Sequence, residues 1–536
     1  MGRTPIFRRL RRAFELARGA NSISLSSKEY LERSLFERSV SRRRFLALGA
    51  NAGIIASLPG SGCSPKHPES SGGPRIAIIG AGIAGLTCAY RLAQGGLGAR
   101  VFESWNRVGG RMFTARDRWA DQQLTELGGE LIDTQHTVLR GLADELGLRL
   151  DAILEPSGNG VRQDTWFFDG RLVADAEIVD AFRPIAPRLA ADAARENDAP
   201  EFARIDRLGL AAYLDSIPEL EPMLRALIDV AYVAEYGLEL ARQSPWNLLW
   251  LIDATTPEPF RVYGDSDEAY HVHGGNDQIP AGLAARLSRP IELEHRLVKV
   301  VEYANGAFGL TFERPGRSVH EEDFDHVVFA LPFTRLREVE LLVNMPQQKR
   351  DMIQQLGMGT NAKLMGQFSE RVWRTQHFAS GSAMTSNGLQ LLWETSRGQA
   401  GSAGILTVFA GGAVGERIGD GTAEEQMTAR LARLDEIFPG SSARYIPGSA
   451  VRMHWPTVEH TRGSYTCYLP GQASFSGHEG EAVGRLRFCG EHTSVDFQGF
   501  MNGGAETGER VARQLLDELG VARHGSHRSQ RAAAVG

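Results

Sequence analysis

The hydrophobic positions after residue 74 predict a strand that runs directly into a helix. Residues 75–80 read Arg-Ile-Ala-Ile-Ile-Gly, a short apolar run typical of a buried strand, and residues 86–94 show the apolar spacing of a helix. A second short strand is predicted at 99–102. Strand, helix and strand in this order indicate a βαβ unit.

Two later regions differ from each other in their patterns. Residues 176–240 are rich in Ala, Arg and Asp and predict a group of helices. Residues 361–368 instead alternate along a strand, so Lys363 is expected to share one face with Met365 and Gln367. The predicted strands of the second half are 298–303, 364–368, 389–393 and 405–409.

The composition is that of an ordinary folded protein. Of 536 residues, 42% are hydrophobic and 23% are charged, which excludes global disorder. Cysteines stand isolated at 63, 88, 467 and 489, so the sequence predicts neither a disulfide scaffold nor a paired-cysteine metal site, and we expect no metal. The net charge of −6 argues against nucleic acid as the main partner.

Positive charge is concentrated at the amino terminus, where residues 1–44 carry twelve Lys or Arg against four Glu. Ser-Arg-Arg-Arg-Phe-Leu at 41–46 precedes an uncharged run at 47–58, which is too short to span a bilayer as a helix. This layout resembles a bacterial twin-arginine export signal, which predicts a periplasmic protein and the export machinery as a partner. An Arg-rich amphipathic tail is the alternative. Lipoprotein anchoring at Cys63 is disfavoured because Gly60, not Leu, stands three residues before it.

Glycines at 80, 82 and 85 join the first strand to its helix as G-x-G-x-x-G. The first glycine allows a tight turn, the second lets the backbone approach a pyrophosphate, and the third lets the helix pack closely on the strand. Glu103 ends the second strand eighteen residues after Gly85, where an acid holds ribose hydroxyls. Together these features predict a dinucleotide-binding unit.

Two further glycine pairs refine this prediction. Gly109-Gly110-Arg111 follows Glu103 closely, and a second pair lies within Glu-Leu-Gly-Gly-Glu at 126–130. With these motifs the chain resembles the flavin-containing amine oxidase family, which includes monoamine, polyamine and L-amino acid oxidases. The resemblance implies that the nucleotide is FAD, that Arg111 lies near its phosphates, and that the second glycine pair lets backbone lie against the flavin.

The resemblance continues in order to about residue 520. It implies that backbone at Val298 faces the adenine side of FAD, that Glu491 lies near the ribityl chain and phosphates, and that a helix follows at about 505–519. The matching segments are 244–250, 272–283, 325–332, 487–491 and 499–504.

The predicted fold class is α/β. We expect a discontinuous Rossmann-like FAD-binding domain with an α+β substrate lobe made of a mixed sheet and helices. The predicted parts are a signal region (1–60), a linker (61–74), FAD-binding segments (75–150, 270–340 and 450–520), a helical first part of the lobe (151–269), its second part (341–449) and a disordered tail (521–536).

The resemblance also implies the reaction site. It gives Lys363 a place beside the flavin N5, bonded through a water, where burial would lower its pKa and let it assist oxygen reduction or imine hydrolysis. Trp455 precedes Tyr465 by ten residues, as in monoamine oxidases, so Tyr465 and Phe500 would form an aromatic cage for an amine nitrogen. Ser464 stands where the family has a flavin-linking cysteine, which predicts non-covalent FAD.

These features predict an FAD-dependent amine oxidase, with O2 as the acceptor and H2O2 as a product. Glu130 stands where L-amino acid oxidases carry a carboxylate-clamping arginine; it is either a pocket carboxylate that suits a cation or a structural group bonded to backbone. An L-amino acid oxidase, a desaturase-type dehydrogenase and a non-catalytic FAD-binding redox partner remain as alternatives. A homodimer is left as an open prediction.

The candidate residues divide into two groups. The catalytic candidates are Lys363, Trp455, Tyr465 and Phe500, with Glu130 in the substrate pocket. The candidate FAD-binding residues are Gly80, Gly82, Ala84, Gly85, Glu103, Arg107, Gly110, Arg111, Gly128, Gly129, Glu130, Val298, Trp455, Gly490, Glu491, Gly499, Phe500 and Met501.

Overall fold

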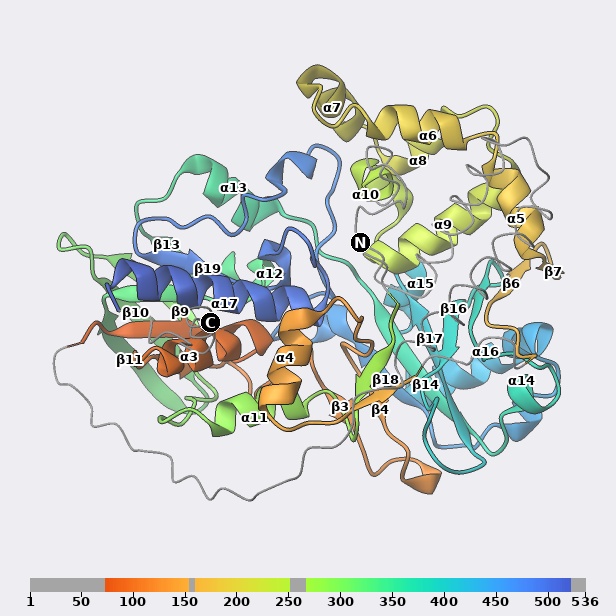
Figure 1. Cartoon of the computed structure of the whole chain (residues 1–536), viewed down its shortest axis with the longest axis horizontal. Coiled ribbons are helices and arrows are strands. Elements are labelled where there is room, and N and C mark those ends of the chain that lie inside the picture. The colour runs from red at the N-terminus through yellow and green to blue at the C-terminus, as the bar shows by residue number, and fades with distance from the viewer. Residues whose placement is uncertain (1–72, 154–159, 251–266, 522–536) are drawn as a thin grey trace, which may run out of the picture.

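The computed structural model describes residues 73–153, 160–250 and 267–521. The predicted signal region, Cys63 and all but the first residue of the predicted tail lie outside these residues. Two halves lie side by side, one built around a parallel sheet and the other around a seven-stranded sheet (Figure 1). Across the described ranges, no helix combines the length and the apolar character that crossing a membrane requires.

A four-stranded parallel sheet with the order β19–β12–β1–β2 forms the centre of the first half. Along β1, Ile76 and Ile78 point into a layer of helices, whereas Ala77 and Ile79 point to the opposite face. Its elements are β1 (Ile76–Ile79), β2 (Arg100–Phe102), β12 (His326–Phe329), β19 (Leu486–Phe488) and the covering helices α3 (Ile83–Gln94), α4 (Thr137–Glu145), α11 (Gln278–Ala285) and α17 (Met501–Glu518).

A second sheet with the order β11–β10–β9–β13 covers the opposite face. Aromatic residues of β10 pack against the parallel sheet, and the Phe102 and Phe312 rings stack at 4.3 Å between centroids. Its elements are β9 (Arg296–Glu302), β10 (Phe308–Arg314), β11 (Arg317–Phe324), β13 (Glu340–Leu342), and nearby α12 (Phe333–Leu336) and α13 (Gln347–Gln355).

The second half is built on a seven-stranded sheet with the order β18–β14–β17–β16–β15–β6–β7. Helix α9 covers one face, where Leu391 and Trp393 point, and α16 covers the other, where Leu392 points. The strands are β6 (Thr165–Phe168), β7 (Arg171–Val173), β14 (Ala362–Phe368), β15 (Ala383–Thr385), β16 (Gln390–Glu394), β17 (Gly404–Ala410) and β18 (Val451–His454).

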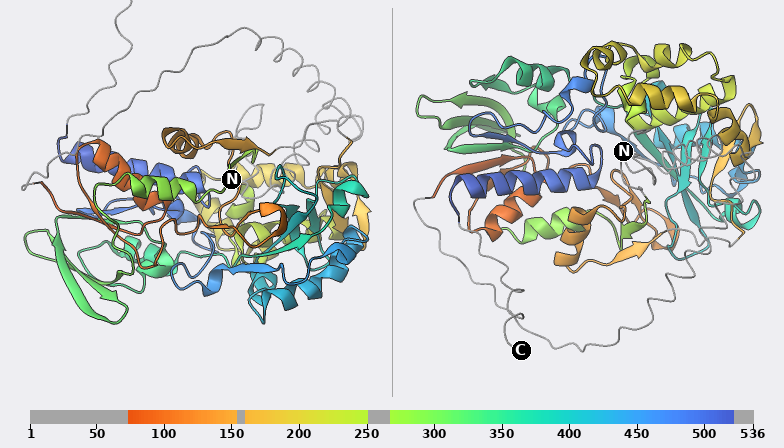
Figure 2. Two further views of the ribbon diagram at one scale, coloured as in Figure 1. Left: turned by 90° about the horizontal axis from the view of Figure 1, so that it is seen from below. Right: turned by 45° about the horizontal axis from the view of Figure 1, so that its top comes forward.

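Helices of the second half gather mainly above the seven-stranded sheet, as Figure 2 shows in its right-hand view. They are α5 (Asp175–Phe182), α6 (Ala186–Ala193), α7 (Ala199–Asp206), α8 (Leu210–Asp215), α9 (Pro222–Tyr236), α10 (Trp246–Leu249), α14 (Val372–Thr375), α15 (Gly412–Arg417) and α16 (Ala423–Ile437).

Short strand pairs and single turns of 3-10 helix complete the described chain. The pairs link segments distant in sequence, since β5 joins β8 across more than one hundred residues. These elements are β3 (Thr114–Ala115), β4 (Thr125–Glu126), β5 (Leu150–Ala152), β8 (Tyr270–Val272), η1 (Ala120–Gln122), η2 (Leu240–Arg242), η3 (Ser442–Arg444), η4 (Trp455–Thr457), η5 (Ala473–Phe475) and η6 (Glu491–Thr493).

Three parts of the fold differ from the pattern-based expectation. Helix α17 begins at Met501, not near 505, and includes a glycine pair. A Cβ at Gly503 would lie 2.0 Å from the Phe497 carbonyl oxygen, and one at Gly504 would lie 2.7 Å from Ile83. Close packing therefore requires glycines inside this helix despite their poor helix propensity.

The segment 151–269 was expected to be helical, yet its residues 165–173 form β6 and β7 of the large sheet. Likewise β18, within the segment 450–520 assigned to FAD binding, pairs with β14 in the same sheet. Both pairings join strands far apart in the chain, which a local hydrophobic period cannot reveal.

Candidate active site

A cavity lies between the two halves, at the carboxyl ends of the parallel strands. It is lined from the first half by residues after β1, β2 and β12 and by the first turns of α3 and α17. From the second half it is lined by residues such as Lys363, Trp393 and Phe409 on β14, β16 and β17. The carboxyl edge of a parallel α/β sheet is where such folds bind nucleotides.

The three glycines of the first motif have three different surroundings. Gly80 adopts φ +111°, and a Cβ there would lie 2.7 Å from the Ala330 carbonyl oxygen. A Cβ at Gly85 would lie 2.0 Å from the Gly80 carbonyl oxygen, so Gly85 packs the helix against the turn. Gly82 lines the cavity with no protein atom near the place of a Cβ, so a side chain there would occupy space that a ligand can take. These are the turn, packing and close-approach roles that the motif predicts.

Glu103 lines the cavity immediately after β2. Its carboxylate accepts hydrogen bonds from the backbone N–H groups of Ala81 and Trp105, each at 2.8 Å. Burial raises the pKa of Glu103, and these two donors oppose the rise. A carboxylate fixed in this way retains lone pairs for the hydroxyls of a ribose.

Arg111 and Glu491 both line the cavity and form an ion pair there. The Arg111 guanidinium donates to Glu491 Oε1 at 2.9 Å and to the Ser464 carbonyl oxygen at 2.6 Å. Glu491 Oε2 accepts from the Gly499 N–H at 2.8 Å, just before α17 begins. This places the predicted Arg111, Glu491 and Gly499 together.

Several observations indicate that the cavity fits FAD. Neither α3 nor α17 has a side-chain cap at its N-terminus, so both first turns can offer N–H groups to an anion. Thr461 lines the cavity, and its buried hydroxyl has no hydrogen-bond partner among the described residues. With the open backbone at Gly82, these groups match the phosphates and polar edges of a dinucleotide.

Lys363 is buried and makes three contacts through its ammonium group. Nζ donates to the carbonyl oxygens of Glu126 at 3.1 Å and Gly128 at 2.9 Å, and to Glu130 Oε2 at 2.6 Å. The same nitrogen lies 5.4 Å from the centre of the Trp393 ring. Glu130 therefore forms an ion pair with Lys363, and both line the cavity.

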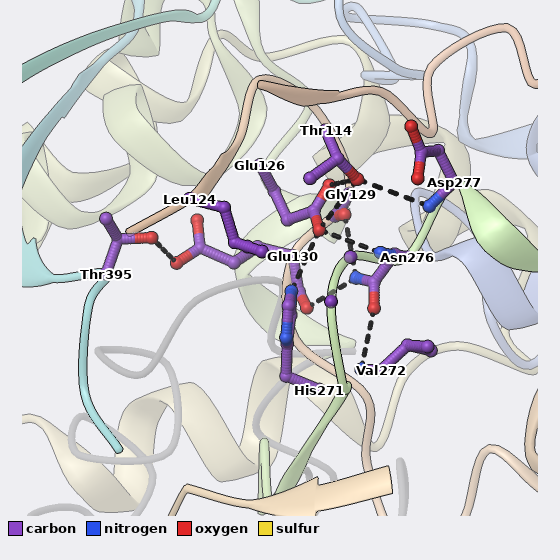
Figure 3. Close-up of polar contacts among 12 residues, drawn as sticks. Thr114, Leu124, Glu126, Gly129, Glu130, His271, Val272, Asn276, Asp277 and Thr395 are labelled. Carbon is purple, nitrogen blue, oxygen red and sulfur yellow. Dashed lines mark hydrogen bonds and ion pairs between the residues drawn. The ribbon is translucent and has the colours of Figure 1, made fainter. Parts of the chain in front are cut away.

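The segment that carries the second glycine pair is held by a buried polar network (Figure 3). Asn276 donates from its side chain to the carbonyl oxygens of Gly129 and Glu130, at 3.1 and 2.8 Å. The Glu126 carboxylate accepts from the Asn276 N–H and contacts the His271 ring, each at 2.8 Å. Burial alone would lower the pKa of His271, but Glu126 outweighs burial, so the pKa lies above its ordinary value.

The predicted aromatic residues lie in the same cavity. Tyr465, Phe500 and Trp455 all line it, and the Trp455 indole donates to the Leu127 carbonyl oxygen at 3.2 Å. The ring of His136 lies behind Phe500, with 5.0 Å between centroids. Burial lowers the pKa of His136 to about 3, so a neutral ring supports this wall.

Most candidate residues line the cavity, but three do not. Gly85 has the packing role described above. Arg107 is clamped between the rings of Trp105 and Phe113, 3.8 Å from each centroid, and burial lowers its pKa to about 10. Val298 also lies outside the lining, although Leu297, its neighbour on the same strand, is part of it. A contact of these three with FAD stays a prediction.

Sequence reasoning missed several lining or supporting residues. Trp393 and Thr395 both donate a hydrogen bond to Glu130. They stand two residues apart along β16 and its continuation, and this spacing was the signal available in the sequence. Glu268 has a buried side chain and the left-handed φ of +44°, and its N–H donates to Asp133 at 2.7 Å. A single glutamate outside any motif offered no signal. Within the described ranges, no cluster of three or more His, Cys, Asp or Glu side chains is placed to hold a metal ion.

Comparison with known proteins identifies the class. The model of the family described as flavin containing amine oxidoreductase matches residues 83–516. The chain therefore belongs to this family, and it is an FAD-dependent enzyme that oxidises amines.

Individual relatives are distant but cover most of the chain. Flavin-containing amine oxidase A of Canis lupus familiaris is 25% identical over 468 residues, covering 83% of this chain and 85% of its own. Amine oxidase B of Sus scrofa is 24% identical over 471 residues, covering 83% and 86%.

Solved structures share the fold. Cyclohexylamine oxidase from Brevibacterium oxydans IH-35A superposes with a TM-score of 0.70 at 22% identity, covering 83% of this chain and 99% of its own. Wild-type putrescine oxidase with bound putrescine gives 0.68 at 19% identity, with the same coverage. The predicted α/β fold, with a Rossmann-like FAD-binding domain and an α+β lobe, is confirmed.

Proposed function

We propose that the protein is an oxidase of primary amines that holds FAD without a covalent link and delivers the electrons to O2. The overall reaction converts R–CH2–NH2, O2 and H2O into R–CHO, NH3 and H2O2, so the two electrons lost from the C–N unit reduce oxygen to peroxide. FAD, when bound, supplies this two-electron chemistry. The residues of the chain bind and orient the amine and exclude bulk water.

The observation that carries the proposal is the position of the Tyr465 and Phe500 rings. Both rings line the same cavity as Lys363 and the Gly82 backbone. Two aromatic faces provide an electron-rich slot for an amine nitrogen without a full negative charge. Trp455 stands behind the second glycine pair, because a Cβ at Gly128 would lie 3.0 Å from its ring.

Charge in the lining favours an amine over an amino acid. Glu130 and Leu131 follow the second glycine pair in the lining, where an L-amino acid oxidase would be expected to carry an arginine. Arg111 is engaged by Glu491 and by the Ser464 carbonyl oxygen. Lys363 neutralises Glu130 within the protein, and the buried Glu268 also lines the cavity.

Ser464 supports the non-covalent part of the proposal. Its hydroxyl donates to Asn361 Oδ1 at 2.6 Å, and both residues line the cavity. Among the described residues that form this lining, none is a cysteine. Cys467 is buried near Asn247 and packs in the core of the substrate lobe.

The test compares amines with the amino acids from which they differ only by a carboxylate. Purified holoenzyme is given phenethylamine or phenylalanine, tyramine or tyrosine, and cadaverine or lysine, while oxygen uptake and peroxide release are recorded. We expect turnover with the amine members. Turnover of the amino acids alone would contradict the proposal and identify the enzyme as an L-amino acid oxidase. No turnover of any of these compounds by FAD-loaded protein would favour a non-catalytic FAD-binding redox partner.

We also propose export by the twin-arginine route to the periplasm. The supporting observation is the Ser-Arg-Arg-Arg-Phe-Leu sequence at 41–46 ahead of an uncharged run. Replacing Arg42 and Arg43 with lysines should leave the folded, FAD-loaded enzyme in the cytoplasm. An unchanged periplasmic yield would contradict export by this route. The homodimer stays a prediction.

A further inference from the structure

The ammonium of Lys363 has an acceptor within the protein for each of its hydrogens. A lysine ammonium carries three N–H donors and no acceptor. The Glu126 carbonyl, the Gly128 carbonyl and the Glu130 carboxylate take one each, at 3.1, 2.9 and 2.6 Å. Two of the three acceptors are backbone groups of the segment that includes the second glycine pair, so the ammonium is tied to that segment as well as to its counter-ion.

Glu130 is itself held in one orientation. Its Oε1 accepts from the Trp393 indole at 2.9 Å and from the Thr395 hydroxyl, leaving Oε2 to face Lys363 (Figure 3 shows Thr395). The Asn276 side chain fixes its carbonyl oxygen. Only 8% of the Glu130 side chain and 6% of the Lys363 side chain are exposed. Charge-assisted bonds within such a buried site are strong and leave little room for rearrangement.

Other charged groups lie around this pair. Glu126 contacts His271 through its carboxylate while its carbonyl oxygen accepts from Lys363. The field of Glu130 raises the pKa of His271 further, so this ring is the titratable neighbour on the β8 side. Burial pushes the pKa of Glu130 up, but Lys363 and its hydrogen-bond donors outweigh burial and hold it below the ordinary value.

We infer that Glu130 is a positioning residue that fixes the Lys363 ammonium in the cavity lining. The Lys363 ammonium then presents its positive charge from a fixed place in the lining, while the ion pair as a whole is neutral. The kinetic consequence rests on the proposed oxidase function, because a fixed positive charge assists the transfer of electrons to oxygen. The ion pair itself does not depend on that function.

The pair predicts a coupled effect on folding stability. Lys363→Met leaves a buried carboxylate without its counter-ion, so the pKa of Glu130 rises above its unfolded value. In that variant the group binds a proton more tightly when folded, so stability is greatest at low pH and is lost as pH rises through the raised pKa. Lys363→Met with Glu130→Gln has neither charge and should lack this pH dependence.

The first experiment follows denaturant unfolding of the FAD-loaded protein from pH 5 to pH 9. We expect Lys363→Met to lose stability as pH rises and the added Glu130→Gln change to restore about half or more of the loss at pH 8. Thr395→Val removes one bond to Glu130 but keeps the ion pair. Its stability should therefore lie between that of the parent and that of Glu130→Gln. A double variant no more stable than Lys363→Met would overturn the inference.

The second experiment measures reoxidation of chemically reduced enzyme by O2, so it requires no amine. In the parent the rate should vary little between pH 6 and pH 9. In Glu130→Gln it should be lower than in the parent by about tenfold across this range, because the ammonium has lost the carboxylate that fixes its position. Glu130→Asp, which keeps a carboxylate, should recover much of the parent profile.

The inference would be overturned if Glu130→Gln were reoxidised by O2 at the parent rate throughout this pH range. If the parent itself failed to react with O2, the proposed oxidase function would fall. The stability comparison would still decide whether the ion pair exists.

Discussion

The Arg111 guanidinium and the Glu491 carboxylate lie 2.9 Å apart, although 380 residues separate them in the chain. The contact joins the first FAD-binding segment to the last, next to the glycine that precedes α17. Because Glu491 is buried, the arginine beside it also compensates a charge that would otherwise be costly. A contact of this kind makes the nucleotide site depend on the complete fold.

Replacing Arg111 should weaken FAD binding more than replacing its near neighbour. Arg111→Met removes a charge-assisted bond at the cavity lining, and we expect the dissociation constant for FAD to rise about ten- to a hundredfold. Arg107→Met is the matched control, since Arg107 lies outside the lining and stacks between two rings. Titration of apoprotein with FAD, followed by fluorescence, measures both. Equal weakening in the two variants would contradict the assignment.

Acid precipitation should release all of the FAD. Ser464 stands before the cage tyrosine and donates to Asn361, so its position offers no thiol to the flavin. After trichloroacetic acid treatment, yellow colour is expected in the supernatant and none in the washed, proteolysed pellet. Flavin that remained attached to peptides would show that another residue forms a link.

Removing the Tyr465 ring should harm amine turnover more than removing its hydroxyl. Tyr465→Leu loses one aromatic face of the slot, and we expect kcat/KM for a primary amine to fall about tenfold or more, as for the loss of a buried ring–nitrogen contact. Tyr465→Phe keeps the ring and should stay within about threefold of the parent. Steady-state peroxide assays compare the two, and similar losses in both would point to the hydroxyl instead.

Stability should depend on Glu479 near neutral pH. Its carboxylate accepts from the Tyr468 hydroxyl at 2.6 Å, and burial raises its pKa to about 7. Since the folded pKa exceeds the unfolded one, this contribution is complete below about pH 4.5 and is lost as pH rises through about 7. The free energy of unfolding of Glu479→Gln should therefore increase relative to that of the parent between pH 5 and pH 9, by on the order of 3 kcal/mol.

The matched control for this prediction is Glu481→Gln, because Glu481 is nearby and its side chain is 57% exposed. Denaturant unfolding at several pH values gives the free energy of unfolding for parent and variants. A constant difference between parent and Glu479→Gln across this range would show that Glu479 does not titrate there.

Local motifs made the nucleotide end of the site predictable. Gly80, Gly82 and Glu103 act through backbone geometry and short-range spacing, so their places follow from a few consecutive residues. Strands such as β14 and β17 were predictable for the same reason, because their apolar runs are short and bounded.

The partner of Lys363 could not be read from the sequence. Glu130 lies 233 residues earlier, and the pairing exists because the fold brings the segment 126–130 against side chains of β14 and β16. The sequence left open whether Glu130 faces a substrate or is bonded within the protein. The structure pairs it with lysine, tryptophan and threonine side chains, which depends on tertiary packing and not on any local period.

The central claim is that this cavity oxidises a primary amine and discriminates against the matching amino acid. Anaerobic stopped-flow mixing of the holoenzyme with cadaverine or lysine, and with phenethylamine or phenylalanine, measures reduction of the flavin directly by loss of its visible absorbance. The account predicts reduction by at least one amine, about a hundredfold or more faster than by its amino acid, the difference expected for a misplaced charge. Faster reduction by the amino acids than by their amines would contradict it.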